Sequence, residues 1–248
     1  MTETNRRITL AKRPVGEVTA DCFAHDEVEI PTPGPGEVLA KVGWLSIDPT
    51  IRGWMAMDTY LPAIEIGAEI RSGGLATVVE SNNDDLPVGA TLFGMTGWQE
   101  YCIMDGSNQI VPEGIDPTAA LSVFGVTGMT AYFGLLDVGR AVEGETVLVS
   151  GAAGATGSVV GQIAKIKGCR VVGIAGSDEK CAWLTDELGF DVAINYKTEN
   201  VADAIRAACP DGVDVFFDNV GGDILEAAIG NIALRGRIVL CGAIAQYN

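Results

Sequence analysis

A strand, a glycine-rich turn and a helix follow one another over residues 145–165, and this stretch constrains the fold most. Thr146–Val149 is a β-branched and aliphatic run, typical of a buried parallel strand. After Gly157, small and aliphatic residues recur at helical spacing. Such a turn points main-chain N–H groups and the positive end of the helix dipole at one spot, where a pyrophosphate fits.

The glycines of this turn form a variant of the dinucleotide fingerprint, with Gly151 followed by the pair Gly154 and Gly157. The alternative interpretation is a tight strand–helix turn of any α/β protein. The downstream pattern favours dinucleotide binding, because the strand–helix rhythm repeats through Arg170–Ala175 and residues 191–196, 214–219 and 237–243.

Composition excludes several partners and locations. The net charge is −17, with 33 acidic and 16 basic residues, and both nucleic acids and anionic membranes need a basic face. The N-terminus lacks the apolar region of a signal peptide, and no apolar run reaches membrane-spanning length. The six irregularly spaced cysteines are expected to be reduced and buried in a cytoplasmic protein.

The first half predicts a small, mostly antiparallel β domain, because short strands alternate with Gly/Pro turns. The expected strands are residues 7–10, 28–30, 38–45, 74–80, 90–93 and 99–104, with a less regular piece at 46–54. Helices are expected at 119–122 and 126–136, so the domain boundary is placed near residue 125.

Three stretches resemble the medium-chain dehydrogenase/reductase superfamily, namely PGPGEVLAKVGWLSIDPTIRGWM, FGVTGMTAYFGLL and AAGATGSVVGQIAKIKGCRVVGIAGSDEK. Within it, they resemble the zinc-free prostaglandin reductase group, which includes plant 2-alkenal reductases and bacterial curcumin reductases. The resemblance implies an α/β fold, with a GroES-like substrate domain over residues 1–125 and a doubly wound, NADP-binding Rossmann domain over 126–248. It also implies an active site in the cleft between the domains, and a homodimer.

The Rossmann pattern shows five strands, whereas relatives continue further. We therefore expect the chain to be C-terminally truncated, with an open sheet edge that favours association or instability and an incomplete nicotinamide half of the site.

The cofactor is expected to be NADPH. An NAD site usually has an acidic residue at the end of the second strand, and here no carboxylate closes the strand end, although Asp178 and Glu179 follow closely. Lys180, Ser177 and Tyr196 could bind a 2′-phosphate, although Lys180 could equally be a solvated helix lysine. The resemblance implies that Lys180 and Tyr196 contact the 2′-phosphate.

The remaining cofactor contacts come from the glycine-rich turn and, by resemblance, from the segments after the fourth and fifth strands. They are Gly154, Ala155, Thr156, Gly157, Asn219, Cys241, Gly242, Ala243, Ile244 and Tyr247.

No metal is expected, and this excludes the zinc alcohol dehydrogenases of the same superfamily. A catalytic zinc needs about three Cys, His or carboxylate ligands. The region that carries a GHE motif in those enzymes reads IGAEIRSGGLATVVES here, with neither His nor Cys. The single histidine, His25, lies in a polar segment and is expected at the surface.

The expected reaction is the transfer of a hydride from NADPH to the β-carbon of an α,β-unsaturated aldehyde or ketone. The developing enolate needs a hydrogen-bond donor and no metal. The candidate catalytic residues are Tyr60 and Tyr247, which match tyrosines of the curcumin reductases by resemblance. Tyr60 could instead be an interface tyrosine bonded to backbone, and for Tyr247 cofactor contact is favoured over proton donation. Arg52 and Tyr60 are the candidate substrate contacts.

One departure from the group concerns substrate. Mammalian prostaglandin reductases have a tyrosine in the segment D-P-Y-M-R, where this chain has Thr50 while Arg52 remains. Prostaglandins are therefore in doubt as natural substrates. Trp44, Trp54 and Met55 could line an apolar pocket or pack in the core. Two other functions stay open: a zinc-free NADPH quinone reductase, and a non-catalytic NADPH-binding protein.

Overall fold

The computed structural model describes residues 4–248 and divides into two compact units. The first unit holds the residues up to Leu121 together with Tyr247–Asn248, and the second unit is Ser122–Gln246. The predicted boundary at residue 125 lies a few residues after this division. Within residues 4–248, no helix combines the length and the apolar character needed to cross a membrane.

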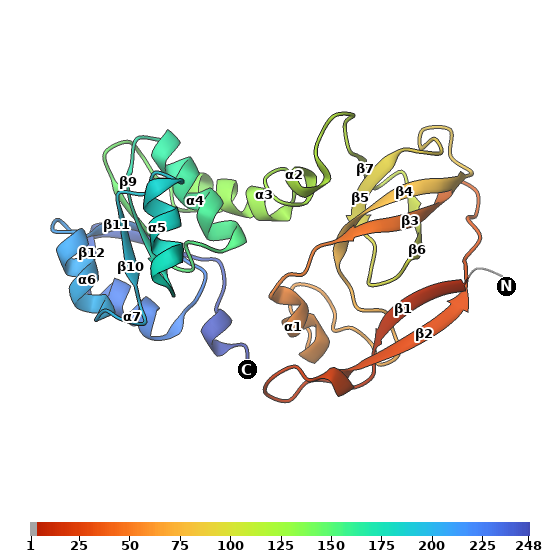
Figure 1. Cartoon of the computed structure of the whole chain (residues 1–248), viewed down its shortest axis with the longest axis horizontal. Helices are drawn as coiled ribbons and strands as arrows, with labels where there is room; N and C mark the ends of the chain where they lie inside the picture. Colours follow the sequence, from red (N-terminus) through yellow and green to blue (C-terminus); the bar gives the residue numbers. More distant parts are fainter. Residues whose placement is uncertain (1–3) are drawn as a thin grey trace. The chain divides into compact units, whose positions relative to one another are not determined.

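The first unit contains two antiparallel sheets (Figure 1). The smaller pairs β1 (Thr4–Leu10) with β2 (Phe23–Glu29). The larger has the order β6-β3-β4-β5-β7, with β3 (Glu37–Leu45), β4 (Gly73–Ser81), β5 (Thr91–Met95), β6 (Tyr101–Asp105) and β7 (Gln109–Ile110). The expected β-rich domain is confirmed, although β2 starts well before the predicted strand and β7 was not predicted.

A helix replaces the irregular piece that was expected at residues 46–54. This helix, α1, spans Thr50–Ala56 and buries Ile51, Trp54 and Met55 on one face. These apolar side chains pack with Leu10 and neighbouring residues in a core cluster beside β1. Burial of this face at i, i+3 and i+4 spacing explains why the segment is helical despite its short length.

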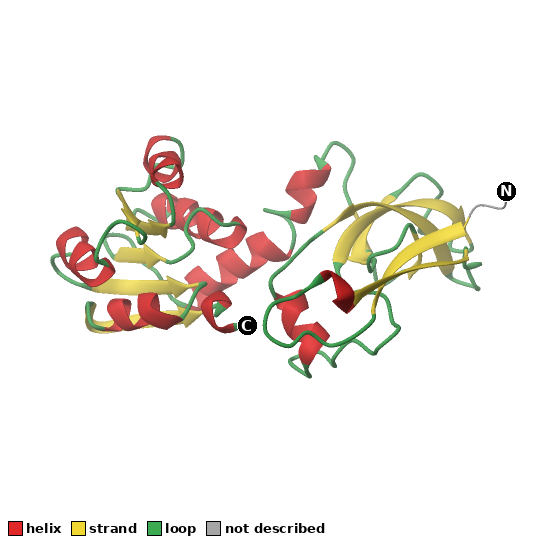
Figure 2. Ribbon diagram, turned by 60° about the horizontal axis from the view of Figure 1, so that its bottom comes forward, coloured by secondary structure: helices red, strands yellow, loops and turns green. Residues whose placement is uncertain are grey.

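The second unit is a five-stranded parallel sheet with helices on both faces (Figures 1 and 2). The strand order is β10-β9-β8-β11-β12, and the strands are β8 (Thr146–Val149), β9 (Arg170–Ala175), β10 (Val192–Asn195), β11 (Val213–Asp218) and β12 (Ile232–Leu240). The predicted Rossmann-type sheet is therefore confirmed.

The helices that cover the sheet divide between its two faces. Side chains of α3 (Val126–Phe133), α4 (Ala155–Ile166) and α5 (Asp178–Asp186) pack in one core cluster, and those of α6 (Val201–Ala208) and α7 (Gly222–Ile229) pack in another. Strand β8 contributes side chains to both clusters, because Val147 and Val149 face the first and Leu148 faces the second. Two further helical pieces, α2 (Pro117–Leu121) and the π-helical turn Gly134–Val138, flank α3 in the chain.

Candidate functional site

The carboxyl ends of β8 and β11 form the switch point of the parallel sheet. From β8 the chain moves outward to β9 and β10, then returns to β11 beside β8 and continues to β12. Open α/β sheets bind ligands at such a point, because the loops leave the two strands in opposite directions. Ser150 follows β8 and Asn219 follows β11, so these residues mark the base of the candidate site.

A buried hydrogen-bond network joins the two strand ends. The hydroxyl of Ser150 donates to Asp218 Oδ1 at 2.7 Å, and both residues are fully buried. The main-chain N–H of Asn219 donates to Ser150 Oγ at 2.8 Å, and its side-chain Nδ2 donates to the carbonyl oxygen of Ser150, also at 2.8 Å. Gly221 donates its N–H to the Asp218 carboxylate at 3.0 Å. Neither Ser150 nor Asp218 is among the predicted site residues; the available signal was a polar residue closing each apolar strand.

The glycine-rich turn brings helix α4 against the chain that leaves β8. The helix begins at Ala155, earlier than the helical spacing expected after Gly157, and its N-cap Gly154 provides no side-chain cap. A Cβ on Gly157 would lie 2.4 Å from the carbonyl oxygen of Gly151, so only glycine fits there. The predicted contacts Ala155, Thr156 and Gly157 form the first turn, whose N–H groups have no carbonyl partner within an α-helix.

The predicted phosphate contacts Ser177, Lys180 and Tyr196 lie at the carboxyl ends of β9 and β10. Ser177 caps α5, since its Oγ accepts the N–H of Lys180 at 3.3 Å. Lys180 lies in the first turn of α5, as predicted, and its side chain is exposed. The Tyr196 ring packs on Gly176, where a Cβ would lie 2.8 Å from the ring. Their contact with a 2′-phosphate stays a prediction.

The segment after β12 lies against the segment after β11. Cys241 and Gly242 donate their N–H groups to the carbonyl oxygen of Asp218, at 2.9 and 3.0 Å. Ala245 donates to the carbonyl oxygen of Val220 at 3.0 Å, in the short 3-10 turn that begins at Ile244. The predicted contacts Cys241, Gly242, Ala243 and Ile244 therefore share an edge with Asn219. Tyr247 belongs to the first unit.

Tyr60 is held at the surface of the first unit. Its side chain is 75% exposed, yet its hydroxyl lies 3.1 Å from Thr50 Oγ1 and its ring meets Trp54 edge to face at 5.9 Å. The alternative of a tyrosine bonded to backbone does not describe this contact. The Thr50 hydroxyl was missed as a partner, because nothing in the sequence indicates that α1 and the Tyr60 loop meet.

Arg52, the other predicted substrate contact, lies on the same helix as Thr50. Its Nη2 donates to the carbonyl oxygen of Gly16 at 2.8 Å, and its Nε donates to Asn248 Oδ1 at 3.4 Å. Trp54 and Met55 are buried in the core cluster beside α1, whereas Trp44 is 49% exposed. Core packing is therefore the correct interpretation of the two buried residues.

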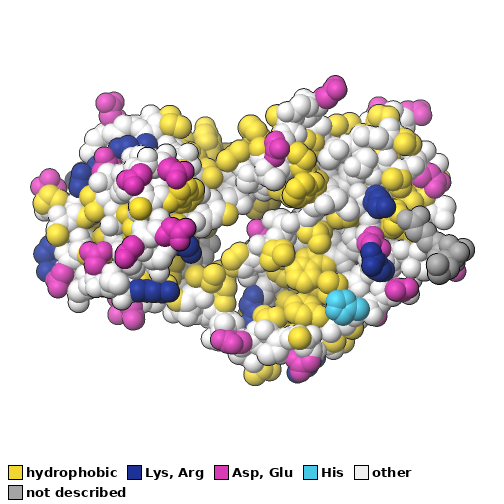
Figure 3. All heavy atoms as spheres, viewed as in Figure 1, with side chains coloured by type: hydrophobic (Ala, Val, Ile, Leu, Met, Phe, Trp, Pro, Cys, Tyr) yellow, Lys and Arg dark blue, Asp and Glu magenta, His cyan; other side chains and the backbone are white. Residues whose placement is uncertain are grey.

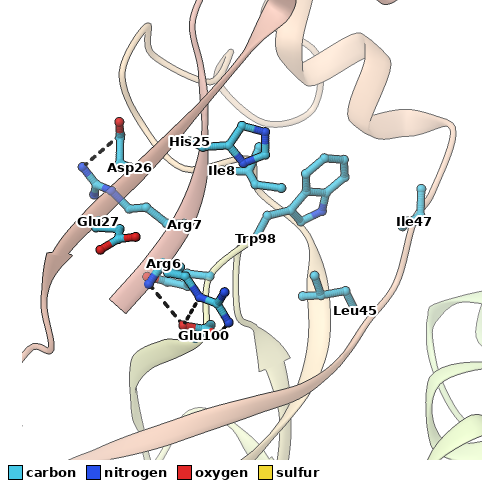
Figure 4. A pocket seen from close by; sticks show the side chains of 11 residues that line it. Arg6, Arg7, Ile8, His25, Asp26, Glu27, Leu45, Ile47, Trp98 and Glu100 are labelled. Atoms are coloured by element: carbon cyan, nitrogen blue, oxygen red, sulfur yellow. Dashed lines mark hydrogen bonds and ion pairs between the residues drawn. The ribbon is translucent and has the colours of Figure 1, made fainter. Parts of the chain in front are cut away.

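A hollow of about 530 Å³ lies elsewhere on the first unit (Figure 4). Apolar side chains of Ile8, Leu45, Ile47 and Trp98 line it, and ion pairs of Arg6 with Glu100 and of Arg7 with Asp26 border it. None of the predicted site residues lines this hollow.

Among residues 4–248, no three or more His, Cys, Asp or Glu side chains are grouped so that they could bind a metal ion. His25 is exposed, and acidic side chains are spread over the visible face of each unit (Figure 3). The six cysteines are free thiols, and burial raises the pKa of Cys102 to about 12 and that of Cys209 to about 11. Cys241 is exposed and Cys181 is half-buried, so the prediction that all cysteines are buried was wrong for these two.

Comparisons with known proteins agree with this architecture. Residues 6–111 match the family described as the N-terminal domain of oxidoreductase, and residues 155–248 match the family described as zinc-binding dehydrogenase. The chain is 42% identical to the NADPH-dependent curcumin reductase of Escherichia coli, covering 98% of this chain and 72% of the relative. It is 46% identical to mouse prostaglandin reductase 1, covering 97% and 73% respectively.

A solved structure shows the same fold as this chain. CurA of Vibrio vulnificus in complex with NADPH superposes with a TM-score of 0.93 at 44% identity, covering 98% of this chain and 73% of that one. A β-rich domain joined to a parallel sheet with a glycine-rich turn is the architecture of a nucleotide-dependent dehydrogenase or reductase. The chain belongs to the medium-chain dehydrogenase/reductase family, in the group that contains the curcumin and prostaglandin reductases.

Proposed function

We propose that this protein is an NADPH-dependent reductase of 2-alkenals and enones, in which the carbon–carbon double bond is conjugated to a carbonyl group. The observation that carries the proposal is the glycine-rich turn at the switch point, with Ser177, Lys180 and Tyr196 at the neighbouring strand ends. Relatives named as NADPH-dependent curcumin reductase and NADP-dependent 2-alkenal reductase support both the cofactor and the substrate class.

The residues of the second unit fit the parts of NADPH. The N–H groups of the first turn of α4 suit a pyrophosphate, and the close approach of the main chain at Gly157 admits no side chain at that position. Lys180 supplies a cation, and Ser177 and Tyr196 supply hydroxyl groups, for a 2′-phosphate. Asn219 and the segment from Cys241 to Ile244 are assigned to the nicotinamide and its ribose. Tyr247, which belongs to the first unit, is assigned to the same part of the cofactor. Residues 126–248 are therefore the cofactor domain in this proposal.

Bound NADPH supplies a hydride for reduction of the polarised double bond. The role of the protein's own residues is to stabilise the negative charge that develops on the substrate carbonyl oxygen. We assign this role to Tyr60, whose exposed hydroxyl can donate a hydrogen bond while Thr50 holds it in place. Arg52 is assigned to the substrate, and Tyr247 to the cofactor and, as a second donor, to the substrate. Residues 1–125 are then the substrate domain.

The test is a turnover assay that follows loss of NADPH absorbance with a 2-alkenal, an enone and a quinone, and with NADH in parallel. The proposal expects rapid oxidation of NADPH with the alkenal and the enone, formation of the saturated carbonyl product, and slower reaction with NADH. Turnover of the quinone alone would contradict it. Binding of NADPH without oxidation in the presence of any of the three acceptors would also contradict it.

A further inference from the structure

Asp178 lies shortly beyond the end of β9, the strand end at which a carboxylate would ordinarily select NAD. It follows Gly157 by about the 20 residues at which an acidic side chain binds the ribose 2′-hydroxyl in the general fingerprint. It is also the first residue of α5, directly after the cap Ser177 and in the same turn as Lys180. A free carboxylate at this position would repel a 2′-phosphate.

The carboxylate of Asp178 is engaged by a buried residue from the next strand. Asn195, the last residue of β10, donates Nδ2–H to Asp178 Oδ1 at 2.6 Å and is only 6% exposed. The orientation of its amide is fixed from the other side, because the N–H of Lys197 donates to Asn195 Oδ1 at 3.1 Å. The amide therefore presents its NH₂ group to Asp178.

Asn195 engages a second acidic side chain nearby. Its main-chain N–H donates to Glu199 Oε1 at 2.7 Å. By contrast, Lys180 takes part in none of the ion pairs formed within residues 4–248. Two carboxylates beside the end of β10 are thus directed to Asn195, while the Lys180 ammonium in the first turn of α5 forms no ion pair with another described residue.

We propose that Asn195 determines the preference for NADPH over NADH, by holding the Asp178 carboxylate away from the 2′-phosphate that Lys180 binds. The inference rests on the proposed function and adds to it a specificity-determining residue that acts through Asp178. Without the Asn195 amide, the carboxylate is free to face the ribose, where it disfavours a 2′-phosphate and accepts a hydrogen bond from a 2′-hydroxyl.

The test measures dissociation constants for NADPH and NADH in the whole chain, by cofactor fluorescence, for the wild type and the variants Asn195→Leu, Asp178→Asn and the double variant. Asn195→Leu keeps the approximate volume and removes the amide. It is expected to lower the ratio of the dissociation constants for NADH and NADPH roughly tenfold, because one negative charge near a partly solvated phosphate has an effect of about this size. The double variant is expected to recover the preference, because it removes the released carboxylate.

Two controls separate this role from a general loss of structure. Asn231→Leu removes another amide of the same unit, which donates to the carbonyl oxygens of Ala227 and Ala202, and it should leave the cofactor ratio unchanged even if stability falls. Asp178→Asn alone retains an acceptor for the Asn195 amide, so it should change the ratio much less than Asn195→Leu does. This variant tests the proposal even if Asn195→Leu does not fold.

The outcomes distinguish the inference from the proposed function. A wild type that binds NADPH tightly, together with an Asn195→Leu variant of unchanged preference, would overturn the inference alone. A large gain in NADPH affinity from Asp178→Asn alone would do the same, because the carboxylate would then already face the phosphate. A wild type that binds neither cofactor, or prefers NADH, would overturn the proposed function itself.

Discussion

The hydroxyl of Ser150 donates to the carboxylate of Asp218 across 2.7 Å, and this bond joins the carboxyl ends of the central strand β8 and its neighbour β11 in the parallel sheet. Both residues are fully buried, and the same hydroxyl accepts the main-chain N–H of Asn219. One side chain therefore fixes the spacing of the loops that flank the candidate pyrophosphate site.

Removing the Ser150 hydroxyl should destabilise the protein. In Ser150→Ala, the Asn219 N–H loses its acceptor and the buried Asp218 carboxylate loses a donor, which should lower the free energy of unfolding by about 2 kcal/mol. Urea denaturation measures this change. Ser107→Ala is the control, because Ser107 is exposed and donates only within its own turn to Asp105. Equal stability of the two variants would contradict the structural role of Ser150.

A methyl group at Gly157 should displace helix α4. Gly157→Ala places a Cβ 2.4 Å from the carbonyl oxygen of Gly151, and main-chain atoms there cannot move aside without shifting the turn. We expect roughly tenfold weaker NADPH binding, because a 1 Å misplacement of main-chain donors is costly. Gly230→Ala is the matched control in the same unit, since its Cβ would meet its neighbours at an ordinary 3.6 Å. NADPH titration of both variants gives the comparison.

The Lys180 ammonium should contribute to NADPH binding and not to NADH binding. Lys180→Ala removes the cation assigned to the 2′-phosphate, so the dissociation constant for NADPH should rise roughly 10- to 100-fold. The value for NADH, which lacks this phosphate, should stay the same. Lys167→Ala removes an exposed lysine beyond the far end of α4 and should change neither value. A parallel loss of affinity for both cofactors would argue against the assignment.

The Thr50–Tyr60 contact should influence turnover more than binding. Tyr60→Phe removes the assigned donor to the substrate carbonyl, and kcat should fall roughly 100-fold. Thr50→Val frees the Tyr60 hydroxyl from its 3.1 Å contact and should give a smaller fall, which Thr50→Ser should restore. The dissociation constant for NADPH should not change in any of the three. Steady-state kinetics with an enone tests this, and full activity of Tyr60→Phe would remove Tyr60 from the mechanism.

Acid stability should depend on Glu145. Hydrogen bonds from Arg237, at 2.6 and 2.8 Å, lower the pKa of this carboxyl below its ordinary value. The native state therefore binds fewer protons than the unfolded state, so the stabilisation is complete above the ordinary pKa and is lost as the pH falls through the lowered native value.

The expected size of this contribution is about 1 kcal/mol, because the pair is partly exposed to solvent. Glu145→Gln should lose it at neutral pH and show a flatter decline of stability toward acid. Glu143→Gln, at an exposed neighbouring position, should retain the wild-type profile. Unfolding free energies between neutral pH and pH about 3 give the comparison; identical profiles for Glu145→Gln and the wild type would contradict the prediction.

The parallel sheet was predictable because burial and local pattern agree there. Thr146–Val149 and Arg170–Ala175 are strands at the predicted bounds, since both faces are covered and nearly every residue is apolar. In β2 the sequence FAHDEVE gives no such signal, and pairing with β1 makes it a strand. In α1, the buried spacing of Ile51, Trp54 and Met55 was present, but Asp48-Pro49, a pair that commonly starts a turn, precedes it, and the segment was expected to be irregular.

The candidate site was predictable only where one segment forms it. The glycine-rich turn is local, so its spacing alone indicated it, whereas the cap that Ser177 forms on α5 was not predicted. Contacts such as Asn195 with Asp178 depend on the register of separate strands and helices, which no local pattern reports.

Gly176 has no side chain, yet it determines where the ring of Tyr196, a predicted cofactor contact, can lie. The Tyr196 ring occupies the space that a side chain at Gly176 would fill. A mutational library restricted to residues that face the cofactor would omit this position. Any programme to redesign cofactor choice must therefore keep Gly176 fixed, or vary it together with Tyr196.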